Sequence, residues 1–332
     1  MNFSLNLFTI VCFSAKILHY STKGKDDFMK PTKTTWFGIQ RKIVANMTTE
    51  SWQTIPHIGY SYEPEVSKFM ETVKKLNASG KFSSKITVNT VMLKAISEGL
   101  KAAPSLNAQI HFDPKRVKGY VTEYEDIHAS MTWVLPNGEM MTINLHDIGS
   151  KSLSELNDYI GDTARKIGNT NLDEVMYSIS FDDTIGALKK GHVRKAVNRL
   201  IGAKIGKHKI ETLSGQEKKD YYAIPEEDRL TKEDIRQGTV CVSNIGSTTR
   251  GIRGHCTMLA VIPPEVFVIC MSAVQKTPVV VTDENGEDKI VPGQIMPMEL
   301  VFDHRALDFG NLVPFLKRME EIFNHPEEMY NW

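Results

Sequence analysis

The sequence of 332 residues contains few cysteines and no excess of charge of either sign. The cysteines form no C-x-x-C pair and have no spacing typical of metal ligands; they are Cys12, Cys241, Cys256 and Cys270. Lys plus Arg and Asp plus Glu each number 40, so the net charge is zero. We therefore expect a reduced, cytoplasmic protein that binds no metal. The balanced charge predicts no nucleic-acid partner.

Long hydrophobic runs are also scarce, and only residues 3–19 resemble a targeting segment or an anchor. No Lys or Arg precedes this run, Lys16 interrupts it, and no clean small-residue cleavage site follows it. It is also shorter than the roughly 20 residues that a membrane helix needs. We interpret residues 1–36 as an N-terminal extension, either poorly ordered or added by an early start codon. The folded domain is then residues 37–332.

No internal repeat and no low-complexity linker divides the chain. Helical periodicity dominates the first half, where Ser152 and Glu155 also predict a capping box. Strand-like runs separated by turn signals dominate the second half, and Asp283–Gly286 predicts a hairpin turn. The predicted helices cover residues 37–54, about 63–77, 86–103, 151–167 and 311–325. This pattern predicts an α/β fold, a two-layer sandwich of helices on a mixed β-sheet.

Two polar stretches follow apolar runs that are typical of buried strands. The stretch FDHRALDFG, residues 302–310, places His304 four residues before Asp308. A histidine at a strand end can act as a general base if a hydrogen bond fixes one ring nitrogen. The stretch VSNIGS, residues 242–247, could direct the Ser243 hydroxyl and backbone N–H groups toward an oxyanion. A structural histidine and an ordinary turn are the alternatives.

Six segments in a fixed order make the sequence similar to a known family. It resembles the catalytic domain of the dihydrolipoamide acyltransferases of 2-oxo-acid dehydrogenase complexes, which has the chloramphenicol-acetyltransferase-like fold. The similarity runs from about Phe37 to Trp332 and omits a basic segment. The segments that carry it are residues 41–57, 86–110, 136–156, 230–247, 262–280 and 302–316.

The resemblance implies that His304 is a general base that deprotonates a thiol, whose thiolate attacks an acyl thioester. Ser243 would donate to the tetrahedral oxyanion, a contact worth about 10²–10³ in rate. Asp308 would organise the site and pair with Arg41. A thiol pKa of about 8.5 lets a lone imidazole suffice, so the absence of a G-x-S-x-G motif is no objection. Further residues expected at the substrate site are Asn244, Gly246, Arg305 and Phe309.

The resemblance also implies that coenzyme A enters as the acyl-CoA substrate, without a metal or a covalent enzyme intermediate. The site would lie between subunits of a homotrimer or a higher assembly, with His304 from one subunit and Ser243 from its neighbour. No segment resembles a lipoyl domain, so we expect no lipoyl group on this chain. The protein would be a stand-alone acyltransferase or one that acts on a lipoyl domain of another chain. The alternatives are a non-catalytic trimeric scaffold and an acetyltransferase for a small hydroxyl or amine.

Two features depart from the family. Phe309 occupies the position of a family glycine and is expected to change the wall of the site. Residues 178–230 are interpreted as a basic insertion, in which residues 186–219 contain ten Lys or Arg and two Glu. Val193, Val197, Leu200 and Ile201 share one predicted helical face. The insertion is a solvated loop, a patch for CoA phosphates or an acidic carrier domain, or a membrane-surface helix.

Overall fold

The structure is a computed structural model that describes residues 30–135, 140–189, 191, 193–194, 197 and 212–332. The chain divides into two units, Met1–Trp36 and Phe37–Trp332. In the first unit, the described residues 30–36 are exposed and form no helix or strand. The apolar run at residues 3–19 and Cys12 lie outside the described residues. Within the described part of the chain, no helix has the length and apolar character to span a membrane.

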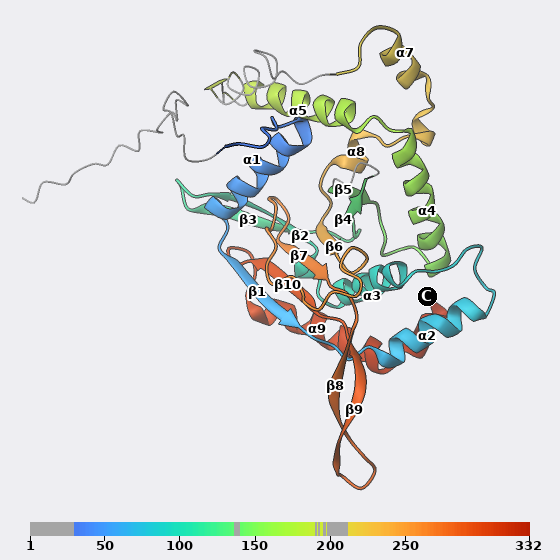
Figure 1. Ribbon diagram of the computed structural model, residues 1–332. Helices are drawn as coiled ribbons and strands as arrows, with labels where there is room; N and C mark the ends of the chain where they lie inside the picture. The colour runs from blue at the N-terminus through green and yellow to red at the C-terminus, as the bar shows by residue number, and fades with distance from the viewer. Residues whose placement is uncertain (1–29, 136–139, 190, 192, 195–196, 198–211) are drawn as a thin grey trace, which may run out of the picture. The chain divides into compact units, whose positions relative to one another are not determined.

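A six-stranded mixed sheet forms the centre of the second unit, with the strand order β1-β10-β7-β6-β4-β5 (Figure 1). Strand β6 runs parallel to both of its neighbours, and the other adjacent pairs are antiparallel. The strands are β1 (His57–Tyr62), β4 (Ala129–Val134), β5 (Met140–Leu145), β6 (Val240–Asn244), β7 (Phe267–Met271) and β10 (Met298–Asp303). The predicted mixed sheet is confirmed.

One face of this sheet packs against a layer of helices, as the two-layer prediction required. Phe315 of α9 meets Phe267 of β7 edge to face, with ring centroids 5.7 Å apart. Gly99 of α3 allows the two helices to approach, because an added Cβ would lie 2.7 Å from the Phe315 ring. The helices that contribute to this core are α2 (Ser67–Ala78), α3 (Val88–Ala102), α4 (Leu153–Asn169) and α9 (Phe309–Asn324).

Local sequence signals explain where these helices begin and end. Helix α4 begins at the predicted capping box, in which Ser152 and Glu155 satisfy each other's backbone N–H groups. Helix α3 ends before Pro104, and α1 (Ile39–Thr54) ends before Pro56. Asp308, four residues after His304, is the N-cap of α9.

The opposite face of the sheet is covered by the connection between β6 and β7. Val261 from this connection packs with Ile55, Val268 and Val301. Because side chains alternate along a strand, the residues on this face are the neighbours of those in the helix-facing core. Several are polar yet buried, including Ser243, Glu299 and Asp303. This face therefore carries the polar groups from which a site could be built.

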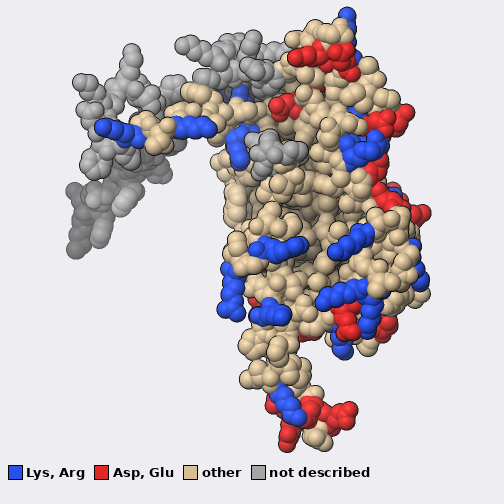
Figure 2. Space-filling model, turned by 45° about the vertical axis from the view of Figure 1, so that its right-hand side comes forward, with Lys and Arg blue, Asp and Glu red and all other residues tan. Residues whose placement is uncertain are grey.

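Two antiparallel ribbons lie outside the sheet, β2 (Ala108–Asp113) with β3 (Lys118–Glu123) and β8 (Gln275–Thr282) with β9 (Asp288–Ile295). The β8–β9 hairpin projects from the domain (Figure 1) and turns at the predicted Asp283–Gly286 stretch, where Gly286 has a φ of 80°. Figure 2 shows basic and acidic side chains spread over the drawn face. It also shows acidic groups at the end of the hairpin, which carries Asp283, Glu284, Glu287 and Asp288.

The segment interpreted as a basic insertion is partly described. Helix α5 (Leu172–Lys189) extends into it, α7 (Gly215–Ala223) lies within it, and α8 (Lys232–Ile235) follows it. Lys218 of α7 pairs with the buried Glu174 of α5, with 2.7 Å between Nζ and Oε1. Leu200 and Ile201 lie outside the described residues, so the predicted helical face around them stays a prediction.

Phe315 provides a test of the helix-to-sheet core because its side chain is fully buried. We expect Phe315→Ala to lower the free energy of unfolding by about 3–5 kcal/mol, through lost transfer energy and the cavity left behind. The neighbouring exposed Lys317→Ala should change it by less than about 0.5 kcal/mol. Urea unfolding at a fixed protein concentration measures both. Equal, small losses for the two variants would show that α9 does not form part of the core.

Candidate active site

His304 follows the last residue of β10, and both its backbone and its ring are held in place. Its backbone N–H donates to the carbonyl of Pro56 over 3.0 Å. Ring Nδ1 lies 2.9 Å from the carbonyl oxygen of Leu307, which can only accept, so Nδ1 carries the proton in the neutral ring. Nε2 then holds the lone pair of a side chain that is 46% exposed. This geometry suits a general base.

Asp308 lies beside this ring, but it is not a buried carboxylate. Its Oδ1 is 3.5 Å from Nδ1 of His304, and its side chain is 85% exposed. Arg41 lies in the first turn of α1, whose other end reaches Pro56 near His304. At 1.5 Å per residue, about 20 Å separates Arg41 from that end. The expected pairing of Asp308 with Arg41 is therefore not made within a subunit, and an exposed Asp308 needs no such partner.

A different ion pair, with a buried carboxylate, lies next to His304. The Asp303 side chain is fully buried, and Arg305 donates to both of its carboxylate oxygens, over 2.9 Å from Nε and 2.6 Å from Nη2. The Arg305 backbone N–H also donates to Asp303 over 2.9 Å. The pair thus clamps the residues on either side of His304. Arg305, expected at the substrate site, is committed to this clamp. The Asp-His-Arg sequence could have predicted this ion pair, because a carboxylate at the end of a buried strand requires a partner.

Ser243 lies near the end of β6 and is only 6% exposed. It is the cross-strand neighbour of Cys270 in β7, and the two side chains are within hydrogen-bonding reach. Burial raises the pKa of the Cys270 thiol to about 12, so this thiol stays neutral at pH 7. The Ser243 hydroxyl therefore lies beside a neutral thiol, not beside a thiolate.

The residues after Ser243 hold a turn. Asn244 Oδ1 accepts from the Gly246 backbone N–H over 2.8 Å, and Asn244 Nδ2 donates to Asn89 Oδ1 over 2.9 Å. A Cβ on Gly246 would lie 3.0 Å from the Ser272 carbonyl oxygen, so glycine allows the turn to pack on the chain after β7. Asn244 and Gly246, both expected at the substrate site, thus shape the turn that follows Ser243, and their contact with substrate stays a prediction.

His304 and Ser243 lie at opposite ends of the sheet. Strand β10 is antiparallel to β7, and the Asp303 N–H donates to the Val266 carbonyl, which puts His304 level with Glu265. Ser243 is level with Cys270, which lies five residues after Glu265 along the chain. The strand of Ser243, β6, is two strands away from β10. At about 3.3 Å per residue and 4.8 Å per strand, the two side chains are roughly 20 Å apart. They cannot act on the same substrate atom within one subunit.

Phe309 is accommodated without strain where the family has glycine. It is the first residue of α9, and its φ is not positive, so the conformational freedom of glycine is not needed. Its ring is 45% exposed and meets Tyr60 of β1 edge to face, with 5.2 Å between centroids. The substitution adds an aromatic surface near His304 and leaves the backbone there ordinary.

His57, another histidine near the sheet, has a structural role. His57 Nδ1 donates to the Ile55 carbonyl over 2.9 Å, and Nε2 accepts from the Val261 N–H over 3.0 Å. Burial lowers the pKa of His57, which keeps the ring neutral in this bridge. Among the described residues, no group of three or more His, Cys, Asp or Glu side chains could hold a metal ion.

The clamp around His304 makes a prediction about stability. Asp303→Ala leaves the Arg305 guanidinium without its buried partner and is expected to lower the free energy of unfolding by about 3–5 kcal/mol. Asp308→Ala removes an exposed N-cap of the same residue type and should cost only about 1 kcal/mol. Chemical denaturation compares the two. A loss for Asp303→Ala no greater than that for Asp308→Ala would contradict the role given to the clamp.

Comparisons with known proteins place this fold in a family. The family model described as 2-oxoacid dehydrogenases acyltransferase (catalytic domain) matches residues 30–178 and 207–331. Residues 179–206, within the segment interpreted as an insertion, are unmatched. The chain is 22% identical to the mitochondrial dihydrolipoyllysine-residue acetyltransferase component 3 of the pyruvate dehydrogenase complex of Arabidopsis thaliana, over 94% of this chain and 47% of that protein. It is 25% identical to the acetyltransferase component from Mycobacterium tuberculosis (strain CDC 1551 / Oshkosh), over 85% of this chain and 40% of the relative.

Solved structures share the fold at low identity. The dihydrolipoamide acetyltransferase (E2p) of Azotobacter vinelandii has a TM-score of 0.62 at 17% identity, covering 92% of this chain and 96% of that one. The cubic core of a pyruvate dehydrogenase multienzyme complex has a TM-score of 0.61, also at 17% identity and with the same coverage. The chain spans about half the length, or less, of the curated relatives named above. Because the family model matches most of the sequence, this chain belongs to the 2-oxoacid dehydrogenase acyltransferase catalytic-domain family, as its resemblance predicted.

Proposed function

We propose that this chain is a CoA-dependent acyltransferase that moves an acyl group between thiols. The substrates are an acyl-CoA and dihydrolipoamide or a similar dithiol, such as a lipoyl domain carried by another chain. One observation carries the proposal: the half-exposed His304 side chain has its Nδ1 tied to a backbone carbonyl, while Nε2 has no hydrogen-bond partner among the described residues. Family membership supplies the reaction class in which a histidine placed this way is used.

The chemistry follows from the arrangement of His304. Its Nε2 removes the proton from the acceptor thiol, and the resulting thiolate attacks the thioester carbonyl. The imidazolium that forms keeps its Nδ1–H bond to Leu307, with the Asp308 carboxylate 3.5 Å away. When the tetrahedral intermediate collapses, the departing thiolate takes the proton back from Nε2. The acyl group has then changed thiols, and the enzyme has returned to its starting state.

The Ser243 hydroxyl is proposed to donate to the oxyanion of that intermediate, from a neighbouring subunit. Roughly 20 Å separates it from His304 of the same chain, so one site needs two copies. A homotrimer or a larger assembly provides such pairs in a closed ring. The related structure of a cubic core supports assembly of this fold into large particles. We place the protein in the cytoplasm.

The Azotobacter enzyme lends further support to these assignments. Its structure was determined to examine a serine, a histidine and an asparagine in its catalytic mechanism, the asparagine four residues after the histidine. Asp308 has the same spacing from His304. We propose that Asp308 fills the asparagine's place as a positioning residue beside the ring. Its carboxylate differs by carrying a charge next to the imidazolium.

His304→Gln provides the test of the proposed base. We expect kcat for acetyl transfer from acetyl-CoA to dihydrolipoamide to fall by about 10²–10⁴, because glutamine cannot accept the thiol proton. His325→Gln is the matched control, since this histidine side chain is 76% exposed and distant in sequence from the proposed site. Acetyl-dihydrolipoamide formation measures both. An unchanged kcat in His304→Gln would refute the assignment, and a wild-type chain that transfers no acyl group would favour the scaffold alternative.

A further inference from the structure

The connection between β6 and β7 carries Cys256 over the face of the sheet on which Cys270 lies. Side chains alternate along β7, and Phe267 belongs to the helix-facing core, so Val268 and Cys270 differ in side: Val268 lies on the opposite face, and Cys270, two residues further, shares it. Val261 of the connection packs on Val268 there. The segment that contains Cys256 thus covers the strand that contains the buried Cys270.

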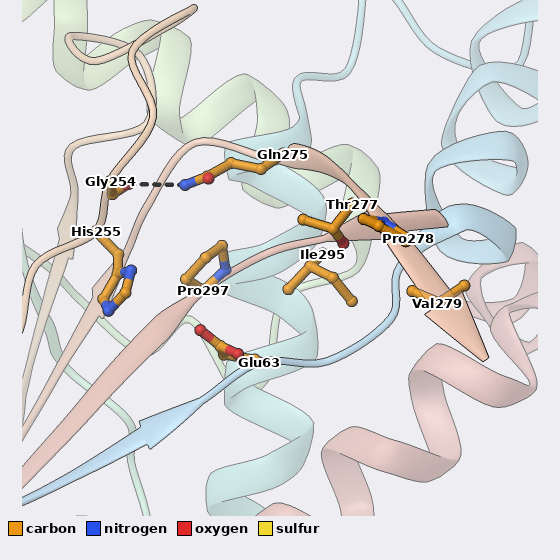
Figure 3. A pocket seen from close by; sticks show the side chains of 9 residues that line it. All are labelled: Glu63, Gly254, His255, Gln275, Thr277, Pro278, Val279, Ile295 and Pro297. Carbon is orange, nitrogen blue, oxygen red and sulfur yellow. Dashed lines mark hydrogen bonds between the residues drawn. The ribbon is translucent and has the colours of Figure 1, made fainter. Parts of the chain in front are cut away.

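Two hydrogen bonds hold the backbone near Cys256 against the chain that follows β7. The Cys256 N–H donates to the Ser272 hydroxyl over 3.3 Å. Ser272 is two residues after Cys270, so only about 7 Å of chain separates them. The Gln275 amide Nε2 donates to the Gly254 carbonyl over 2.7 Å, two residues before Cys256. Figure 3 shows this second bond at the edge of a pocket.

The side chain of Cys270 interacts with both Cys256 and Ser243. Burial, and after it the Cys256 thiol, raises the pKa of Cys270 to about 12, whereas a hydrogen bond with Ser243 acts in the opposite direction. Both cysteines are free thiols in the structure. Two thiols that interact in this way, one of them beside the proposed oxyanion donor, are placed for reaction with each other.

The two cysteines differ in their access to solvent. Cys270 is fully buried, whereas Cys256 is partly exposed and lies between the exposed residues His255 and Thr257. A dissolved oxidant therefore reaches Cys256 first. Burial raises the pKa of Cys241, the remaining described cysteine, which keeps its thiol protonated and disfavours its oxidation.

We propose that Cys256 and Cys270 form a redox-sensitive pair that a peroxide converts to an intramolecular disulfide. The Cys256 sulfur attacks one oxygen of hydrogen peroxide, the O–O bond breaks, and Cys256 sulfenic acid and water are formed. The Cys270 sulfur then attacks the Cys256 sulfur, the S–O bond breaks, and the Cys270 proton leaves with the hydroxyl group as water. Two thiols and one hydrogen peroxide thus give one disulfide and two waters, and the peroxide takes up two electrons.

The connection can accommodate this bond. Residues 252–262 form no helix or strand, so their backbone can adjust to the S–S distance of about 2.05 Å without breaking a helix or a sheet ladder. The disulfide would fix the connection to β7 at the level of Ser243, which is the cross-strand neighbour of Cys270.

Oxidation is expected to disturb Ser243, and this consequence rests on the proposed function. The Cys270 sulfur would move toward Cys256 and lose its proton, so the Ser243 hydroxyl would lose its present neighbour. A displaced oxyanion donor should lower kcat by about tenfold or more, up to the roughly 10²–10³ that loss of such a donor costs. Reduction of the disulfide should restore the rate.

Peptide mapping by mass spectrometry tests the pair. The reduced full-length chain is treated with limiting hydrogen peroxide, and remaining thiols are blocked in denaturant before digestion. We expect a linked Cys256–Cys270 peptide, which Cys256→Ala abolishes and the matched control Cys241→Ala retains at the wild-type level. A Cys241–Cys270 link, a link between chains, Cys256 sulfinic acid without a link, or unreacted thiols would overturn the proposal.

Activity tests the consequence for Ser243. Acetyl transfer is followed from S-acetyl-dihydrolipoamide to CoA, because a dithiol acceptor would reduce the disulfide. We expect peroxide to lower kcat of the wild type by about tenfold or more, dithiothreitol to restore it, and Cys256→Ala to keep its rate throughout. A linked wild type with unchanged kcat would refute the effect on Ser243. If the reduced wild type transfers no acyl group, the proposed function fails together with that effect, whereas peptide mapping still decides the pair.

Discussion

His304 and Ser243 lie at opposite ends of the central sheet because β10 runs antiparallel to β7 while β6 runs parallel to it. The imidazole of His304 therefore lies at one end of the strands, and the hydroxyl of Ser243 lies at the other end, roughly 20 Å away. No side-chain movement closes that distance. Under the proposed mechanism, chemistry that uses both groups has to be completed by a second copy of the chain.

His304, the proposed base, is held in place by interactions inside one chain. Asp303 and Arg305, on either side of His304 in the sequence, form a bidentate ion pair with a buried carboxylate. The Leu307 carbonyl accepts from the His304 ring. A buried pair of this kind contributes little net stability relative to apolar residues, although breaking it is costly. Its value here is geometric, because it fixes the turn from which the imidazole projects. Asp308 then starts α9, whose Phe315 anchors the turn to the core.

Much of the fold could be predicted from sequence because it depends on local signals. The capping box at Ser152 and the hairpin turn at Asp283–Gly286 are encoded within a few residues, and the structure contains both. The candidate site was harder, because pairing across the fold is not a local property. The Arg41–Asp308 pair was expected without knowledge of which end of α1 meets β10, and it is not formed within a subunit.

The same limit applies to the partners of the predicted site residues. Only tertiary structure reveals that Arg305 pairs with Asp303 and that Asn244 donates to Asn89. Phe309 illustrates the converse: its glycine-like position required a special backbone only if the turn had a positive φ, and it does not. Figure 3 shows a pocket lined by three segments that are distant in sequence, so no single stretch of the sequence could predict it.

Mixing two inactive variants tests the shared site most directly. Ser243→Ala alone should lose about 10²–10³ in kcat, and His304→Gln alone should also be impaired. In particles assembled from equal amounts of the two, about a quarter of the interfaces combine an intact His304 with an intact Ser243. We therefore predict that co-assembly restores roughly a quarter of wild-type activity. A mixed assembly, verified by mass spectrometry, that is no more active than its two parents would contradict a site built from two subunits.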